Sequence, residues 1–264
     1  MTAVSFQKSP REPFMFIERV VRRYVSLRPL SEYEIGLLRG LASRRETHPS
    51  GWELSNDGRP SARRIIVDGW AGRTRVLPDG RRQILALLLP GDAVGICTPP
   101  NPQALSSTIA LTPLLTVDAT ALNDALLRRD PRCAGIHEAF AIIGGLNEVM
   151  LLDQIVRLGR QTAYERTAHL LLELRERLVV VGMVQGDTFV LPLTQDQMAE
   201  TLGVSVVHMN RTLQQMRRDH LIETKRGHIK LLDLKSLAVI ADFRQRWPSA
   251  STLPQSALAN RKTR

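Results

Sequence analysis

The sequence predicts an α+β protein made of a β-roll, a long helix and a winged helix-turn-helix, in that order. Three patterns predict this fold class. Short apolar segments divided by turn motifs run from Gly51 to Leu122, as in a small antiparallel barrel. A helical apolar repeat then runs from Ile136 to Leu158. Two capped helical segments and a short basic hairpin occupy residues 193–231.

Two helices are expected before the barrel. Residues 14–27 carry apolar side chains at helical spacing, and Ser31 with Glu34 forms a capping box for a second helix that reaches Leu41. The turns of the barrel are expected at residues 56–58, 78–80 and 90–92, and its core strands at residues 65–67, 84–89 and 114–117.

The long helix is apolar on two stripes. One small domain covers less apolar surface than this, so we expect the helix to pair with a second copy across a two-fold axis. The expected contacts are Ile136, Phe140, Ile143, Leu146 and Met150. Gly144 and Gly145 fit either a close approach of two helices or a kink, and Gly159 is expected to end the helix as a hinge.

Residues 193–222 predict two helices joined by a tight turn at Gly203. Thr194 caps the first helix with Gln197 reaching back, and Ser205 caps the second. The second helix buries one apolar face and exposes Val207, His208, Asn210, Arg211, Gln214 and Gln215, side chains suited to base edges and phosphates. An ordinary packed helix pair shows the same pattern, so the next segment matters.

The segment after the second helix predicts a β-hairpin. Residues 221–224 and 228–231 alternate as short strands around Lys225, Arg226 and Gly227. A hairpin directly after such a helix is typical of a wing, whose cations contact phosphate without selecting sequence. The alternative is a solvated hairpin with no role for its cations.

Together these segments resemble the Crp/Fnr superfamily of bacterial transcription regulators. Residues 69–73, 77–85 and 89–92 resemble the family's β-roll, and residues 160–172 resemble the start of its DNA-binding domain. The resemblance implies an N-terminal β-roll sensor domain of the cyclic-nucleotide-binding type, a long dimerisation helix and a C-terminal winged helix-turn-helix. The domains expected are 1–130, 131–159 and 160–247, followed by a disordered tail at 248–264.

The bulk composition fits this class. A chain of 264 residues suits two modest domains, and a net charge of +10 favours a polyanionic partner, although the cations are scattered over both halves. No uninterrupted apolar run reaches the ~18 residues of a membrane span, and residues 1–13 lack a signal-peptide core, so we expect a cytoplasmic protein with no membrane contact. The family's oxygen-sensing branch uses a cysteine-ligated iron–sulfur cluster, but Cys97 and Cys133 are too few thiols for one.

The effector pocket implied by the resemblance is degenerate. The family's cyclic-nucleotide sensors use a Gly-Glu pair for the ribose and an Arg-Ser pair for the phosphate. Here Gly95 keeps the glycine, Ile96 replaces the glutamate, and Ser106 with Ser107 stands at the Arg-Ser position without the arginine. We therefore expect no productive binding of cAMP. We predict no cofactor.

Other effector chemistries stay open. Cys97 is a candidate redox thiol, although a small buried hydrophobe is the commoner role, and His137 is a candidate haem ligand, as in gas-sensing relatives. The proline-rich loop at residues 99–102 is expected to be only a connector.

The function predicted is sequence-specific DNA binding by a homodimer. Arg211 matches the family's base-reading arginine, whereas Val207 replaces its usual glutamate, so a different half-site is expected. The other expected DNA contacts, to thymine methyls, base edges or phosphates, are Thr194, Gln195, Ser205, Val206, His208, Asn210, Lys225 and Arg226. RNA polymerase is a further candidate partner. The alternative is a regulator that binds DNA only with a non-nucleotide effector, namely a redox signal, haem with a gas, or a small apolar ligand.

Two other classes fit less well. An enzyme is not expected, because the sequence has no GxSxG, GxxxxGK[ST] or HExxH motif and its histidines are dispersed. A purely oligomerising protein would leave the basic wing unexplained.

Overall fold

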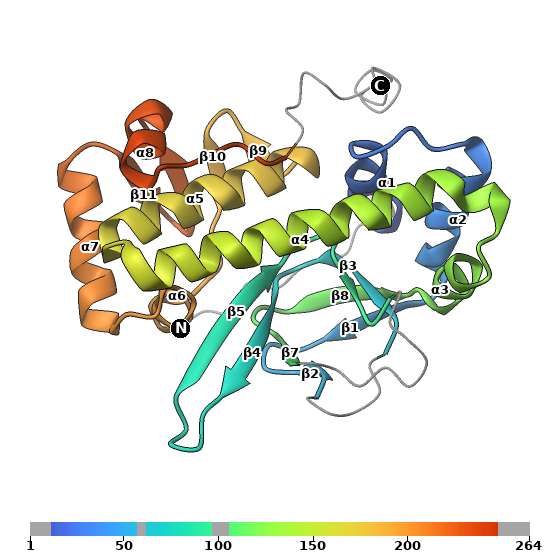
Figure 1. The fold of residues 1–264 in the computed structure, drawn as a ribbon, viewed down its shortest axis with the longest axis horizontal. Coiled ribbons are helices and arrows are strands. Elements are labelled where there is room, and N and C mark those ends of the chain that lie inside the picture. Colours follow the sequence, from blue (N-terminus) through green and yellow to red (C-terminus); the bar gives the residue numbers. More distant parts are fainter. Residues whose placement is uncertain (1–11, 57–61, 97–105, 248–264) are drawn as a thin grey trace.

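The structure is a computed structural model, and it describes residues 12–56, 62–96 and 106–247. These residues form the α+β architecture expected from the sequence, with a sheet domain followed by a helix-turn-helix region (Figure 1). The tail at 248–264 and the loop at 97–105, which contains Cys97 and residues 99–102, lie outside the described residues.

The β-roll consists of two four-stranded antiparallel sheets, with strand orders β1-β8-β3-β6 and β2-β7-β4-β5. The strands are β1 (Arg45–His48), β2 (Glu53–Ser55), β3 (Arg64–Asp68), β4 (Ala71–Val76), β5 (Arg82–Leu88), β6 (Ala93–Val94), β7 (Ser107–Ala110) and β8 (Leu114–Asp118). The three predicted core strands are confirmed as parts of β3, β5 and β8.

The ends of the roll differ from the expectation. Strand β1 begins before Gly51, and its first three residues are exposed, so no apolar alternation marks it in the sequence. The predicted barrel reached Leu122, but that residue lies in helix α3 (Thr120–Leu127), where Leu122 and Leu126 are buried. A short apolar run of this kind fits a strand or a buried helix equally well.

The N-terminal helices α1 (Glu12–Val25) and α2 (Glu32–Gly40) pack on the roll, and a short turn of 3-10 helix, Leu41–Ser43, follows α2. The capping box at Ser31 is confirmed. Glu34 in that box also accepts a hydrogen bond from the backbone nitrogen of Ile136 at 2.8 Å, which ties α2 to the start of the long helix. Burial opposes ionisation of Glu34, but the hydrogen bonds from Ser31 and Ile136 outweigh it and lower its pKa.

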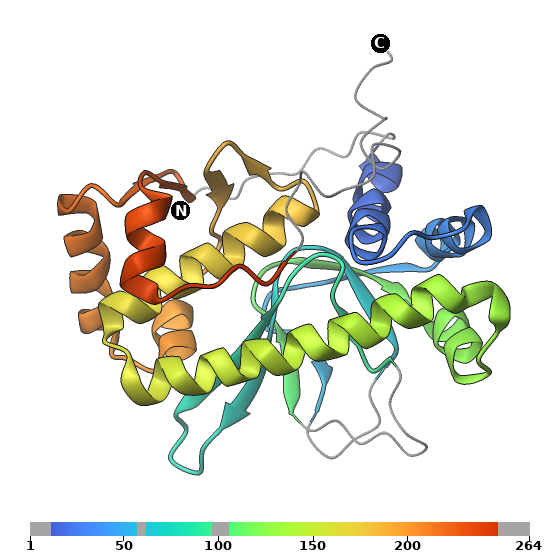
Figure 2. The same cartoon turned by 45° about the horizontal axis from the view of Figure 1, so that its top comes forward.

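Helix α4 (Ala134–Arg160) follows a turn of 3-10 helix at Pro131–Cys133 and runs the length of the molecule (Figures 1 and 2). The expectation that Gly159 ends this helix is wrong, because α4 continues through Gly159 to Arg160. Gly159 is also not among the glycines with positive φ, so the left-handed geometry of a glycine stop does not occur there. Thr162 then caps the next helix, α5 (Ala163–Val180), through a capping box with Glu165.

The C-terminal half is a winged helix-turn-helix, as predicted. After α5 come β9 (Val184–Gln185), β10 (Thr188–Val190), α6 (Gln195–Leu202), α7 (Val206–Arg218), β11 (Ile222–Lys225), β12 (His228–Leu231) and α8 (Leu234–Ala241). The wing β11-β12 is part of a four-stranded sheet with the order β11-β12-β10-β9. The two short strands β9 and β10 were not anticipated.

The two halves share one apolar core. Trp70, Ile84 and Leu111 of the roll belong to the same buried cluster as Leu170 of α5 and Leu202 of α6. Polar contacts reinforce the junction: Arg82 of β5 donates from Nε to Glu200 Oε2 of α6 at 2.9 Å. The helix-turn-helix therefore docks against the β4-β5 hairpin of its own chain.

Candidate DNA-binding surface and effector pocket

The helix-turn-helix is held by the three local devices that the sequence predicted. The Thr194 hydroxyl accepts from the backbone nitrogen of Gln197 at 3.1 Å, and the Gln197 side chain accepts from the backbone nitrogen of Thr194 at 2.9 Å. Gly203 has the left-handed φ of +64° that the tight turn requires. Ser205 accepts from the backbone nitrogen of His208 and begins α7. These caps fix the direction in which α7 leaves the turn.

Helix α7 has one buried and one exposed face. Met209, Thr212, Leu213 and Met216 are buried against the domain. The exposed face includes Val207, 62% accessible, with His208, Arg211, Gln214 and Gln215. An open recess on this face is lined by Ser205, Val207, His208, Arg211, Thr212 and Gln215. The surface therefore offers a guanidinium, an imidazole and amides around one exposed valine.

Two of the expected DNA contacts lie deeper than the exposed face. Val206 is half-buried and packs against the core cluster of the domain, so it is not free on the outer face of α7. Asn210 is also half-buried. Thr194 and Gln195 are exposed at the start of α6, and Ser205 is exposed at the start of α7.

The wing presents its cations to solvent. Lys225 and Arg226 are exposed at the turn between β11 and β12, where Arg226 has a φ of 49° and Gly227 a φ of 77°. Arg217 at the end of α7 donates to the Thr224 hydroxyl at 3.0 Å, which ties the helix to the wing. The wing cations and the exposed face of α7 therefore belong to one connected unit.

The degenerate pocket contains no acidic or basic side chain at its two signature positions. Gly95 has a φ of +70°, and Ile96 is half-buried and packs against the core of the roll. Ser106 and Ser107 are half-buried at the start of β7. A side chain that packs in an apolar core offers nothing to a ribose hydroxyl.

The candidate cofactor ligands are dispersed. His137 is half-buried near the start of α4, and Cys133 just before it is buried, which raises the pKa of its thiol. Within residues 12–56, 62–96 and 106–247, no three histidine, cysteine, aspartate or glutamate side chains lie close enough to hold a metal ion.

The apolar residues of α4 divide differently from the expectation. Ile136 is fully buried, Phe140 packs on Tyr24 with ring centroids 5.3 Å apart, and Ile143 packs on the same cluster. These three predicted dimer contacts face their own β-roll. Leu146 and Met150 are half-buried. The exposed apolar side chains of α4 are instead Ile142, Leu151, Leu152, Ile155 and Val156.

Two further properties of α4 bear on this face. Gly144 and Gly145 are exposed, and a Cβ added at either would meet no atom of the chain within 4 Å. Within the part of the chain that the structure describes, the segment Pro131–Arg160 is long and apolar enough to span a membrane: an 18-residue stretch of it has a mean hydropathy of 1.5, and 11% of that stretch is buried. Length and composition alone are weak grounds for a membrane span, and an uncovered pairing helix has the same properties.

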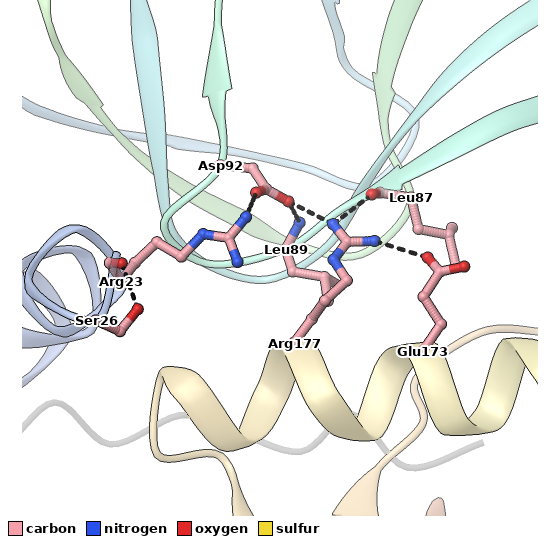
Figure 3. Close-up of polar contacts among 7 residues, drawn as sticks. All are labelled: Arg23, Ser26, Leu87, Leu89, Asp92, Glu173 and Arg177. Atoms are coloured by element: carbon pink, nitrogen blue, oxygen red, sulfur yellow. Dashed lines mark hydrogen bonds and ion pairs between the residues drawn. The ribbon is translucent and has the colours of Figure 1, made fainter. Parts of the chain in front are cut away.

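Sequence reasoning missed a buried ion network between the halves (Figure 3). Asp92 of the roll pairs with Arg23 of α1 at 2.8 Å and with Arg177 of α5 at 2.6 Å, and Arg177 also pairs with Glu173 at 3.1 Å. Burial lowers the pKa of Arg23 to about 10, so it stays charged at neutral pH. Burial opposes ionisation of Asp92, but Arg177 and Arg23 outweigh it and lower its pKa. Directly paired members lie up to 85 positions apart, so no local pattern marks them.

Comparison with known proteins now identifies the family. A family model described as the Crp-like helix-turn-helix domain matches residues 165–240. The transcriptional activator protein FnrL of Cereibacter sphaeroides is 33% identical over 187 residues, which are 65% of this chain and 69% of that protein. The chain belongs to the Crp/Fnr family.

Other relatives agree. The nitrogen fixation regulation protein FixK of Bradyrhizobium diazoefficiens is 29% identical over 182 residues, covering 67% of this chain and 72% of FixK. The structure of FixK2 from Bradyrhizobium japonicum has a TM-score of 0.63 at 24% identity, covering 74% of this chain and 96% of that one. A CooA mutant from Carboxydothermus hydrogenoformans shares the fold, with a TM-score of 0.56 at 16% identity over 75% of this chain and 87% of CooA.

Membership of the Crp/Fnr family settles the class of protein. The relatives are named transcriptional regulators and not enzymes, so this chain is a DNA-binding transcription regulator. The predicted family, the predicted fold class and the prediction that the protein is not an enzyme are confirmed.

Proposed function

We propose that this protein acts in the cytoplasm as a homodimer that binds a near-palindromic operator, with one α7 helix in each of two successive major grooves. The observation that carries the proposal is the exposed face of α7, set between the Ser205 cap and the basic wing. Recognition helices of a two-fold dimer reach half-sites about one helical turn apart. The operator should therefore contain two inverted half-sites ~10–11 bp apart.

Arg211 is the proposed reader of a guanine. It is exposed on α7, and its guanidinium matches the O6 and N7 acceptors of guanine in the major groove. Val207, next to it on the exposed face, replaces the family's usual glutamate and is suited to a thymine methyl group. The preferred half-site should accordingly differ from the sites that the glutamate-bearing members read. His208 and Asn210 are the proposed polar readers beside it.

The remaining contacts are proposed to go to phosphate. The hydroxyls of Thr194 and Ser205 stand at two helix N-termini, where backbone N–H groups and the helix dipole favour an anion. Lys225 and Arg226 of the wing add charge without selecting sequence. Gln195, exposed in the first turn of α6, is the remaining proposed contact.

Dimerisation is proposed through the exposed apolar face of α4. Its exposed isoleucine, leucine and valine side chains, each 40–67% accessible in the single chain, form an apolar stripe. The exposed Gly144 and Gly145 favour a close approach of two such helices over an intramolecular role. RNA polymerase is a further proposed partner of the DNA-bound dimer.

We propose that cAMP is not the effector. Ile96 packs in the roll's core at the position of the family's glutamate, and Ser106 with Ser107 stands at the Arg-Ser position without the arginine. The alternative is a regulator that needs a non-nucleotide effector before it binds DNA. In a haem-linked form of that alternative, His137 is the candidate haem ligand, because its Nε2 is buried and has no hydrogen-bond partner.

The experiment that tests the proposed function is selection of duplexes from a random pool by the purified, ligand-free protein, followed by sequencing. Enrichment of an inverted repeat would support an effector-independent regulator and would reveal what Val207 and Arg211 read. Salt-sensitive binding without enrichment would favour the effector-gated alternative. No DNA binding would contradict the effector-independent regulator and would leave the effector-gated alternative.

A further inference from the structure

A small cavity lies at the junction of the β-roll, the long helix and the DNA-binding domain. Its lining comes from β4 and β5 of the roll, from α4, and from α5 and α6 of the C-terminal half. Its volume is about 40 Å³. One ordered water needs roughly 10–15 Å³, and drug-sized ligands occupy pockets of roughly 300 Å³ or more. The cavity therefore has room for a small ion and not for a nucleotide or a haem.

The charged lining of this cavity is mostly basic. Arg73, Arg157 and Arg177 line it, and Glu173 is its only acidic lining residue. The neighbouring His169 adds no charge at pH 7, because burial and the nearby Arg157 lower its pKa to about 4 and keep its ring neutral.

The buried ion cluster around the cavity is unbalanced. Arg23, Arg157 and Arg177 are each at most 5% accessible, and they face two buried carboxylates, Asp92 and Glu173. Arg177 and the other arginines favour ionisation of both carboxylates, and the pKa values of Asp92 and Glu173 are lowered despite their burial. Among these five groups, one positive charge is therefore left without a counter-charge. Burial of an unpaired positive charge is energetically unfavourable, and a bound anion would compensate it.

Of the three arginines, Arg157 has the least complete set of partners, with two buried nitrogens that make no hydrogen bond against one each in Arg23 and Arg177. Its Nη2 lies 3.0 Å from Glu173 Oε2, whereas its Nε and Nη1 are buried and have no hydrogen-bond partner. A buried guanidinium normally uses most of its five N–H donors. Two nitrogens of a side chain that is 95% buried thus stand beside a cavity large enough for an acceptor.

We propose that this cavity binds a small anion, an inorganic oxyanion or a short carboxylate no larger than phosphate, held chiefly by Arg157. Charge-assisted hydrogen bonds from guanidinium to such oxygens are short and strong, and an anion there also balances the buried cluster. Because the lining joins the β4-β5 hairpin, α4 and α5, a bound anion would contact the sensor half and the DNA-binding half at once.

Titration calorimetry on the full-length protein tests the proposal without DNA, so its failure would leave the proposed regulator function untouched. The probes are sodium phosphate and sodium acetate, in a sodium gluconate background of constant ionic strength whose anion is too large for the cavity. We expect saturable binding of one anion per chain, with a Kd raised at least tenfold in Arg157→Gln. This variant leaves two arginines facing two carboxylates, so its cluster is balanced. Arg160→Gln, an exposed arginine on the same helix, should bind like the wild type.

Each result of these titrations either supports or overturns the proposed anion site. Saturable binding of phosphate alone or acetate alone supports the proposal and assigns the ligand to oxyanions or to carboxylates. Absence of saturable binding to the wild type overturns it, and so does an unchanged Kd in Arg157→Gln. If that variant fails to fold, wild-type crystals soaked in bromide decide the matter. An anomalous peak within hydrogen-bonding reach of Arg157 supports the site, and an empty cavity overturns it.

Discussion

Arg211 carries more of the proposed sequence preference than any other single side chain of α7. It is exposed, it lines the recess on the outer face of the helix, and its planar guanidinium suits the two acceptors of guanine. Lys225 on the wing is equally exposed but is a single point charge at a hairpin turn. Substitution of these two residues should therefore affect DNA binding in different ways.

We predict that Arg211→Ala weakens operator binding by ~1–3 kcal/mol while leaving non-specific binding nearly unchanged. Lys225→Ala is the matched control and should weaken binding to all duplexes alike, with a salt slope smaller by about one. Fluorescence anisotropy on operator and scrambled duplexes over a salt series measures both. Equal losses on both duplexes for Arg211→Ala would make Arg211 a phosphate contact.

His169 makes the stability of the fold depend on pH. It is 6% accessible on α5, and its ring meets Phe243 edge-on at 4.9 Å. Burial, aided by Arg157, lowers its pKa to about 4, so the folded state excludes a proton that the unfolded chain binds below about pH 6.5. In this window the unfolded state holds more protons, and stability falls as the pH falls from 6.5 towards 4.

We predict that His169→Phe removes this dependence. Relative to the variant, the wild type should lose about 2 kcal/mol of unfolding free energy between pH 7 and pH 5. Burial raises the pKa of Glu176 to about 7, and it titrates nearby, but it is present in both proteins and cancels in the difference. Urea unfolding at the two pH values measures the effect, and parallel pH profiles would contradict it.

At the scale of the element, helix α4 has two apolar faces with different surroundings. Its stripe through Ile136 and Phe140 closes the β-roll of its own chain, and the stripe through Leu152, Ile155 and Val156 is left uncovered. Apolar spacing detects both stripes but does not say which one another surface covers. The apolar pattern of the helix therefore predicts that the helix pairs with another surface, but it does not predict which residues form that contact.

We predict that Ile155→Arg converts the dimer to a monomer. Ile155 is 67% accessible in the single chain, and a charge there would be buried against its copy across the two-fold axis. Sedimentation velocity should show a dimer dissociation constant raised roughly 100-fold or more, because burying an unpaired charge costs several kcal/mol. The control is Val239→Arg on α8, which is 82% accessible and should stay dimeric. A fully dimeric Ile155→Arg protein would exclude this face.

At the scale of the whole molecule, a buried charge network joins the DNA-binding half to the β-roll half. Arg177 of α5 reaches Asp92 of the roll and the carbonyl oxygen of Leu87, at 2.6 and 2.8 Å. Arg23 completes the link to α1 and lies over the Trp247 ring, 3.6 Å from its centroid. The segment after α8 thus returns to the N-terminal helix and closes the assembly.

We predict that Arg177→Met lowers the unfolding free energy by about 3–5 kcal/mol, because the buried oxygens of Asp92, Glu173 and Leu87 lose the hydrogen bonds that Arg177 donates. Arg175→Met is the matched control on the same helix. It breaks the partly exposed pair with Asp187, which should cost at most about 1 kcal/mol. Urea unfolding compares the two, and equal losses would mean that the buried network is no stronger than a surface pair.

Local chemistry made much of this protein predictable from its sequence. The caps at Ser31, Thr194 and Ser205 and the turn at Gly203 depend on neighbours a few residues away, so the sequence places them correctly. The family resemblance follows from the same short segments, and with it the fold class and the class of function. The exposed face of α7 could be read from its helical period, apart from Asn210, which is half-buried.

Only the tertiary structure decided the features that join distant parts of the chain. Which stripe of α4 faces outward depends on where the β-roll lies, and Gly159 stays helical because α4 continues to Arg160 before Thr162 caps α5. The pairing of Arg23, Asp92 and Arg177 and the cavity beside Arg157 need three elements brought together. The sequence determined the elements because their signals are local in the chain, whereas the structure decided how charges and apolar faces meet because those contacts are local only in space.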